Sequence, residues 1–150
     1  MNPTTINDTI VQEITIQAPA EEIFDALTNP ERLVQWWIVP GQFQMTHLES
    51  DLRPGGKRIM RGSGYGRAVT VTGEYREIER PRLLVFTWLP DWQGDAVESV
   101  VRFDLEERDG CTVVRLTHSG LVSEKSRQSH RGWPQLLALL QAHAERRSSS

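Results

Sequence analysis

The sequence contains little cysteine, no long apolar run and no excess of either charge, and each shortage excludes a class of protein. Cys111 is the only cysteine in 150 residues, which excludes an internal disulfide and any zinc cluster built from cysteines. No apolar run approaches the ~20 residues of a membrane-spanning helix. The 17 Lys and Arg against 20 Asp and Glu give a net charge of -3, with no general attraction for nucleic acid. We therefore expect a cytoplasmic protein with neither a nucleic-acid nor a membrane partner.

The length predicts one domain with a single hydrophobic core. Residues 1–9 are polar and lack the basic-then-apolar order of a signal peptide, so we expect a flexible N-terminus there. The folded domain is expected over residues 10–146, followed by a flexible tail at 147–150.

The first quarter of the chain predicts one strand and two short helices. Residues 10–17 alternate between apolar and polar side chains, which is the period of a half-buried strand. Pro19 ends this strand and suits the start of a helix. Asn29 and Pro30 repeat that start signal as a helix cap and a first helical residue, so a second short helix should end near residues 36–37.

From there to residue 119 the sequence is typical of an antiparallel meander. Runs rich in Val, Thr and aromatic residues are separated by turn residues, and five such breaks predict six strands. The glycine-rich break at 62–66 indicates a hairpin turn and not a phosphate loop, because no helix follows it. Alternation places ten residues on inner faces: Leu84, Phe86, Trp88, Val97, Val101, Phe103, Leu105, Val114, Leu116 and His118.

Beyond residue 121 the apolar period becomes helical. The apolar stripe consists of Trp133, Leu136, Leu137, Leu140 and Ala144. It predicts a long helix that packs on the sheet. Because Pro134 lacks a backbone N–H, either this helix kinks there or a separate turn over residues 123–131 precedes it.

Seven motifs occur in an order that is similar to a known family: Phe24–Pro30, Gln35–Trp37, Asp51–Gly56, Gly73–Tyr75, Leu84–Trp88, Leu116–Gly120 and Gly132–Trp133. From about residue 11 to 145 the chain resembles the activator of heat shock protein 90 ATPase homologue-like family, within the START-related, polyketide-cyclase-like (SRPBCC) superfamily. The resemblance implies an α+β helix-grip fold, in which a curved antiparallel sheet of about seven strands wraps a long C-terminal helix. It also implies a cavity between them for a small hydrophobic or amphipathic molecule. The co-chaperone activity in the family's name belongs to members with an additional N-terminal domain, so we do not expect it of this chain.

The candidate ligand-binding residues are side chains that such a fold brings toward the cavity. Trp36 and Trp37 are either core packing or, with one indole facing outward, part of a cavity entrance. His118 follows the inward alternation of the last strand, either as a hydrogen-bonded core residue or as a titratable group in the cavity. The complete set is Trp36, Trp37, Arg53, Tyr75, Phe86, Trp88, Phe103, His118, His130, Trp133 and Leu137.

Three of these candidates have structural alternatives. His130 lies either on the gripped helix face or exposed in a first helical turn. Arg53 either reaches an anionic ligand group or braces a turn with Asp51. Tyr75 offers a hydroxyl group and is also an ordinary strand aromatic.

Other polar residues are assigned no site. The four histidines, His47, His118, His130 and His143, show no ligand spacing, so we expect neither a metal nor a cofactor. The basic residues Lys57, Arg58, Arg61 and Arg67 are expected to form a solvated edge that discourages strand pairing.

Three hypotheses of function remain. The first is noncatalytic binding of a small hydrophobic molecule, with the tryptophans as walls and His118 or Arg53 as polar anchors. The second is an enzyme of the cyclase, dehydratase or hydrolase kind, in which His118 exchanges a proton; a fully packed imidazole counts against it. The third is a protein-interaction role, such as chaperone regulation or formation of a homodimer.

Overall fold

The computed structural model describes residues 8–92 and 97–148, and within them eight strands and four helices. Most of the expected flexible segment 1–9 lies outside the described residues, whereas residues 147 and 148 of the expected tail belong to the last helix. In chain order the elements are β1 (Ile10–Ile16), α1 (Ala20–Thr28), α2 (Pro30–Trp36), β2 (Ile38–Val39), β3 (Phe43–Ser50), β4 (Lys57–Gly64), β5 (Arg67–Glu79), β6 (Leu83–Pro90), β7 (Ser99–Arg108), β8 (Cys111–Ser119), α3 (Glu124–Ser129) and α4 (Trp133–Ser148).

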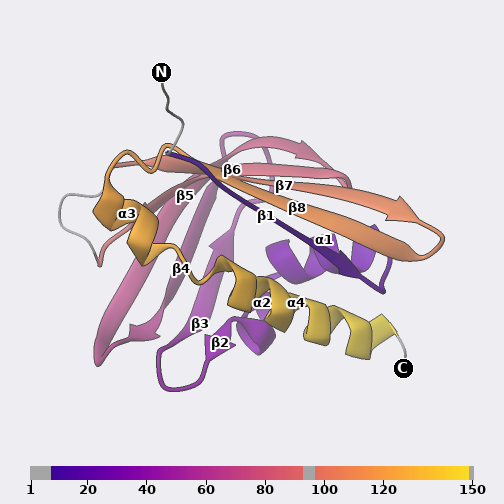
Figure 1. The fold of residues 1–150 in the computed structure, drawn as a ribbon, viewed down its shortest axis with the longest axis horizontal. Helices are drawn as coiled ribbons and strands as arrows, with labels where there is room; N and C mark the ends of the chain where they lie inside the picture. The colour runs from indigo at the N-terminus through magenta and orange to yellow at the C-terminus, as the bar shows by residue number, and fades with distance from the viewer. Residues whose placement is uncertain (1–7, 93–96, 149–150) are drawn as a thin grey trace.

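The described strands form one antiparallel sheet in the order β1-β8-β7-β6-β5-β4-β3-β2. The sheet curls into a half-barrel, and α4 lies along its concave side (Figure 1). This arrangement confirms the predicted α+β helix-grip fold. The sheet has one strand more than expected, because Ile38–Val39 pair with β3 directly after α2. Two residues are too few to display the alternation from which a strand is predicted.

The short helices begin at the predicted start signals. The side-chain oxygen of Asn29 accepts a hydrogen bond from the backbone N–H of Glu31 at 3.0 Å, and Pro30 is the first residue of α2. Pro19 directly precedes α1 and has an extended backbone conformation. Together the two helices carry the chain across the open side of the sheet and deliver Trp37 beside α4.

Two separate helices, α3 and α4, occupy the region around Pro134, so the alternative of a single kinked helix is wrong. Ser123 caps α3, its hydroxyl oxygen accepting from the backbone N–H of Ser126 at 3.0 Å, and α3 ends at Ser129. Pro134 is then the second residue of α4. Because the N–H groups of a first helical turn have no helical acceptor, the proline costs this helix no hydrogen bond.

The curl of the sheet has local causes. The register shifts between Met45 and His47 in β3 and between Tyr75 and Glu77 in β5, and such bulges bend a strand. Near the second shift, β5 and β6 approach so closely that a Cβ atom on Gly73 would lie 2.0 Å from the carbonyl oxygen of Thr87. Only glycine fits at this position.

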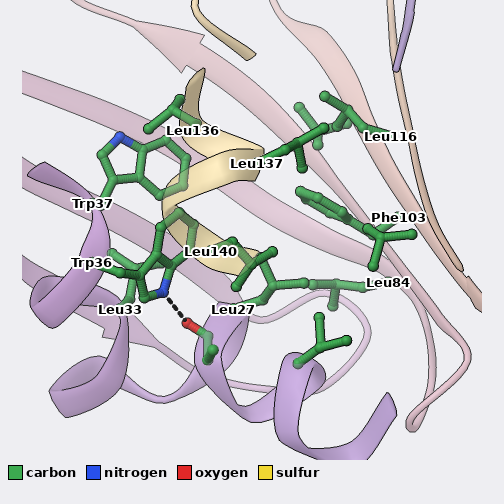
Figure 2. Close-up of a cluster of buried hydrophobic side chains, with 14 of the residues drawn as sticks. Leu27, Leu33, Trp36, Trp37, Leu84, Phe103, Leu116, Leu136, Leu137 and Leu140 are labelled. Carbon is green, nitrogen blue, oxygen red and sulfur yellow. Dashed lines mark hydrogen bonds between the residues drawn. The ribbon is translucent and has the colours of Figure 1, made fainter. Parts of the chain in front are cut away.

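The core fills the space between the sheet and the helices. The apolar stripe of α4 is buried as predicted, and Leu140 is fully enclosed. Figure 2 shows Leu137 and Leu140 pointing toward Leu84 and Phe103 of the sheet, with Trp36 on the opposite side. Of the ten residues expected on inner faces nine are buried; Val97 is 50% exposed because β7 begins only at Ser99.

Candidate functional site

A cavity of about 480 Å³ lies between the beginning of α4 and the half of the sheet that contains β3 to β6. This volume falls within the roughly 300–1,000 Å³ that small-molecule pockets occupy. Its walls are formed by Trp37, Phe43, Met45, Gly64, Tyr65, Arg67, Val69, Trp88, Trp92, His130, Gly132, Trp133 and Leu136.

Aromatic rings from three distant parts of the chain form the inner walls. Trp37 follows α2, Trp88 belongs to β6, and Trp133 begins α4. The rings of Trp37 and Trp88 are stacked with centroids 6.2 Å apart, and Trp133 meets Trp37 edge-on at 5.9 Å. Each ring is therefore held in a fixed orientation by its neighbours.

The β4–β5 hairpin contributes the exposed side of the cavity. Its turn holds Tyr65 at a φ of 51°, followed by Gly66 at 83°, and the Tyr65 side chain is 78% exposed. On the same hairpin, Arg67 donates a hydrogen bond from Nη2 to the backbone oxygen of Trp92 at 3.1 Å. The hairpin and the loop after β6 are thus joined at the cavity.

His130 is held in one neutral tautomer. Trp88 donates from Nε1 to Nε2 of His130 at 2.9 Å, and an indole N–H can only donate. The Nδ1 atom of His130 is 2.7 Å from the backbone oxygen of Ser126 and must donate to it. Both ring nitrogens are therefore engaged within the protein.

His118 lies behind the cavity wall, deeper in the core than His130, and is fixed in the opposite tautomer. It accepts from Nε1 of Trp133 at its own Nδ1, at 3.1 Å. Its Nε2 lies 2.8 Å from the hydroxyl of Ser99, which in turn donates to the backbone oxygen of Trp88 at 3.2 Å. The imidazole is 0% exposed and has no bonding position left for a ligand.

Burial keeps both imidazoles uncharged. Burial foremost, together with the neighbouring His130, whose ring centroid is 4.8 Å away, lowers the pKa of His118 to about 3. Burial also lowers the pKa of His130, although its bond to the Ser126 carbonyl acts in the opposite direction. At neutral pH the histidine pair adds no positive charge to the site.

Some of the predicted ligand-binding residues line the cavity: Trp37, Trp88, His130 and Trp133. Others are buried in the core without belonging to its walls: Trp36, Tyr75, Phe86, Phe103, His118 and Leu137. Trp36 donates from Nε1 to the backbone oxygen of Ala26 at 3.0 Å (Figure 2), so its polar atom serves the helix pair. The exposed-turn alternative for His130 is wrong, since its side chain is 6% exposed.

The remaining predicted site residue, Arg53, lies outside the cavity. Its Nε donates to Oδ2 of Asp51 at 2.8 Å, and both side chains are mostly exposed. This is the turn-bracing arrangement.

The prediction of a solvated basic edge is wrong for Arg58, which is 3% exposed. Its Nη1 donates to the backbone oxygen of Leu27 at 2.9 Å and to the Tyr75 hydroxyl at 3.0 Å. The guanidinium also lies over the ring of Phe86, 4.4 Å from its centroid. The position faces inward on β4, and the cation–π contact and two acceptors stabilise it there.

Sequence reasoning missed nine of the residues that line the cavity: Phe43, Met45, Gly64, Tyr65, Arg67, Val69, Trp92, Gly132 and Leu136. Phe43 and Met45 alternate along one strand, and that period was an available signal. For Tyr65 and Arg67 no local signal existed, because a hairpin turn has the same sequence whether or not it borders a cavity.

Two features are absent from the part of the chain that the structure describes. In residues 8–92 and 97–148, no group of three or more His, Cys, Asp and Glu residues is placed to hold a metal ion. Over the same ranges, no helix has the length and apolar character required to cross a membrane.

Comparison with known proteins agrees with this architecture. The model of the family described as Activator of Hsp90 ATPase homolog 1-like protein matches residues 17–145. No curated protein sequence matches the chain.

Solved structures share the fold. A Chromobacterium violaceum protein has a TM-score of 0.80 and 25% identity, over 92% of this chain and 98% of that one. An HSP90 activator from Plasmodium falciparum has a TM-score of 0.71 and 23% identity, over 91% and 95%. CalU16 from Micromonospora echinospora has a TM-score of 0.67 and 24% identity, over 91% and 75%.

Proposed function

This chain belongs to the Activator of Hsp90 ATPase homolog 1-like family, and we propose that it binds a small hydrophobic or amphipathic molecule in its cavity without catalysing a reaction. The observation that carries the proposal is the aromatic cavity itself. Four of the chain's five tryptophans, Trp37, Trp88, Trp92 and Trp133, line it. Large rings contribute much apolar contact area for little loss of side-chain freedom.

The state of the histidines favours binding over catalysis. A general acid or base must reach the proton that it transfers, within about 3 Å or through one water. His118 is 0% exposed and bonded at both nitrogens, and His130 is bonded at both nitrogens as well. Neither imidazole offers a free position to a bound molecule.

Location and assembly are part of the same proposal. We propose a cytoplasmic protein, acting alone or as a homodimer. A protein-interaction role such as chaperone regulation is the alternative, and it predicts that binding of a partner, and not of a small molecule, stabilises the fold.

Native mass spectrometry of the freshly purified protein, compared with its denatured spectrum, tests the proposal. A ligand carried from the cell appears as an extra mass that is lost on denaturation. Tryptophan fluorescence against a library of lipids and aromatic molecules extends the test, since four tryptophans line the cavity.

A matched pair of variants gives the control. Val69→Phe adds a ring to the cavity wall, at a native valine that is 4% exposed. Val11→Phe makes the same change outside the cavity, at a valine of β1 that is 47% exposed. We expect V69F, once circular dichroism shows it folded, to lose binding and V11F to retain it. Equal binding by both variants, or an apo mass with no fluorescence response across the library, would contradict the proposal.

A further inference from the structure

The indole N–H groups of the four buried tryptophans differ in whether they donate a hydrogen bond within the described protein. Three of them donate within the protein: Trp36 to Ala26, Trp88 to His130 and Trp133 to His118. These donors are consumed in holding the helix pair and the two imidazoles. They are not available to a ligand unless the wall itself rearranges.

Trp37 is the exception. Its side chain is 3% exposed and lines the cavity, yet its Nε1–H donates to no residue of the described chain. Nε1 of Trp37 is also not fully buried. The only fully buried side-chain nitrogen or oxygen without a hydrogen-bond partner in the described residues is Nε of Arg58. In Figure 2 the nitrogen lies on the side of the ring away from Leu140 and Leu27, with no bond drawn to it.

The other polar groups of the wall are either occupied or in water. His130 is bonded at both nitrogens, and the Tyr65 side chain is 78% exposed. Trp92 is only half-buried, so water competes for its N–H. No carboxylate occurs among the described residues that line the cavity, and Arg67 carries the one formal charge there. The wall is therefore mostly aromatic and aliphatic, with the exposed Arg67 at its edge and one sheltered, unpaired donor.

We propose that the cavity selects flat aromatic molecules that carry a hydrogen-bond acceptor, such as a carbonyl oxygen, and that Trp37 Nε1–H binds this acceptor. The inference rests on the proposed function and names its ligand class. The donor is fixed before the ligand arrives, because Trp37 is held between the rings of Trp88 and Trp133. A preorganised donor in a sheltered site discriminates by the cost of leaving the ligand's acceptor, or the donor, unpaired.

Two probes of equal shape separate this hydrogen bond from ring packing. 2-Acetylnaphthalene carries a carbonyl group, and 2-isopropenylnaphthalene replaces that oxygen by a CH₂ group. Affinities for the ¹⁵N-labelled protein are measured by titration of its ¹H–¹⁵N spectrum. The indole region directly reports which N–H shifts when the carbonyl probe binds, and the Trp37 signal is identified by its absence from the variant below.

Trp37→Phe keeps an aromatic ring and removes the donor. Trp36→Phe is the matched control, because it removes an indole N–H that lies outside the cavity and is bonded to Ala26. A lost buried hydrogen bond of about 1–2 kcal/mol corresponds to roughly tenfold. We expect W37F to weaken 2-acetylnaphthalene about tenfold and 2-isopropenylnaphthalene less than twofold, while W36F leaves the ratio of the two affinities unchanged.

The outcomes distinguish the two proposals. If both probes bind and W37F changes them equally, or if the Trp92 N–H shifts and that of Trp37 does not, the selection by Trp37 is refuted and the binding function stands. If neither probe binds the wild-type protein, the aromatic ligand class is refuted together with the inference. A downfield shift of the Trp37 N–H that only the carbonyl probe produces supports both.

Discussion

Acidification should destabilise this protein through His118. The folded pKa of His118 is about 3, below the 6.5 of an unfolded histidine. Between pH 6.5 and 3, His118 therefore binds a proton in the unfolded state but stays neutral in the folded state. The stability that the neutral imidazole contributes is complete above pH 6.5 and is lost as the pH falls from there toward 3.

The size of the loss follows from the two pKa values. Each pH unit in this window costs up to about 1.4 kcal/mol per histidine, so between pH 7 and pH 5 His118 alone should remove about 2 kcal/mol from the free energy of unfolding. His130 adds to the loss, because burial lowers its pKa as well. His143 acts in the same direction, its pKa being lowered by burial and by nearby arginines, Arg32 foremost.

Urea unfolding at the two pH values measures this loss, and His118→Asn isolates the share of His118. The asparagine oxygen can still accept from Trp133 Nε1, but the side chain does not titrate. The variant will be less stable at pH 7, yet its further loss on acidification should be about 2 kcal/mol smaller than that of the wild type. All other titrating groups are common to both proteins. Equal losses in the two proteins would refute the reasoning.

Three further predictions concern packing and are checked by urea unfolding at pH 7. Gly73→Ala should lower the free energy of unfolding by about 2 kcal/mol or more, because its Cβ would lie 2.0 Å from the Thr87 carbonyl oxygen. The control Gly132→Ala, whose Cβ would have nothing within 4 Å, should lower it by less than about 1 kcal/mol. Equal losses in the two variants would contradict the prediction. Leu140→Ala, at a fully enclosed position, should cost about 2–5 kcal/mol, and a loss below about 1 would mean that the helix is not gripped. Arg32→Met should cost about 2 kcal/mol, less than a fully buried ion pair, because its two carboxylate partners are 23% and 33% exposed; no loss would show that water already screens the pair.

Local patterns predicted the elements correctly because their causes are local. The cap at Asn29 and Pro30 lies at the start of α2, where the two residues supply a side-chain acceptor and a preset backbone angle. The spacing of Trp133 to Ala144 produces an apolar face on any helix, and that face is buried. The two-residue strand β2 lies below the length at which such a period exists.

The walls of the cavity were predicted less completely. Trp37, Trp88, His130 and Trp133 were among the candidates, but Tyr65, Arg67 and Trp92 were not. The latter come from a hairpin and from a loop, where sequence carries no sign of which side meets the rest of the chain. Only the curl of the sheet brings them opposite the beginning of α4.

The sequence by itself determined the order of the strands and helices apart from β2 and α3, and the faces of the sheet that turn inward, since these depend on residues close together along the chain. The order of its motifs along the chain determined the family. The tertiary structure alone decided how the polar groups are used. It buried Arg58 over Phe86 and bonded His118 and His130 at both nitrogens. It also left the N–H of Trp37 without an acceptor among residues 8–92 and 97–148. Those outcomes depend on atoms that lie many residues apart in the sequence and meet only when the curled sheet closes on α4.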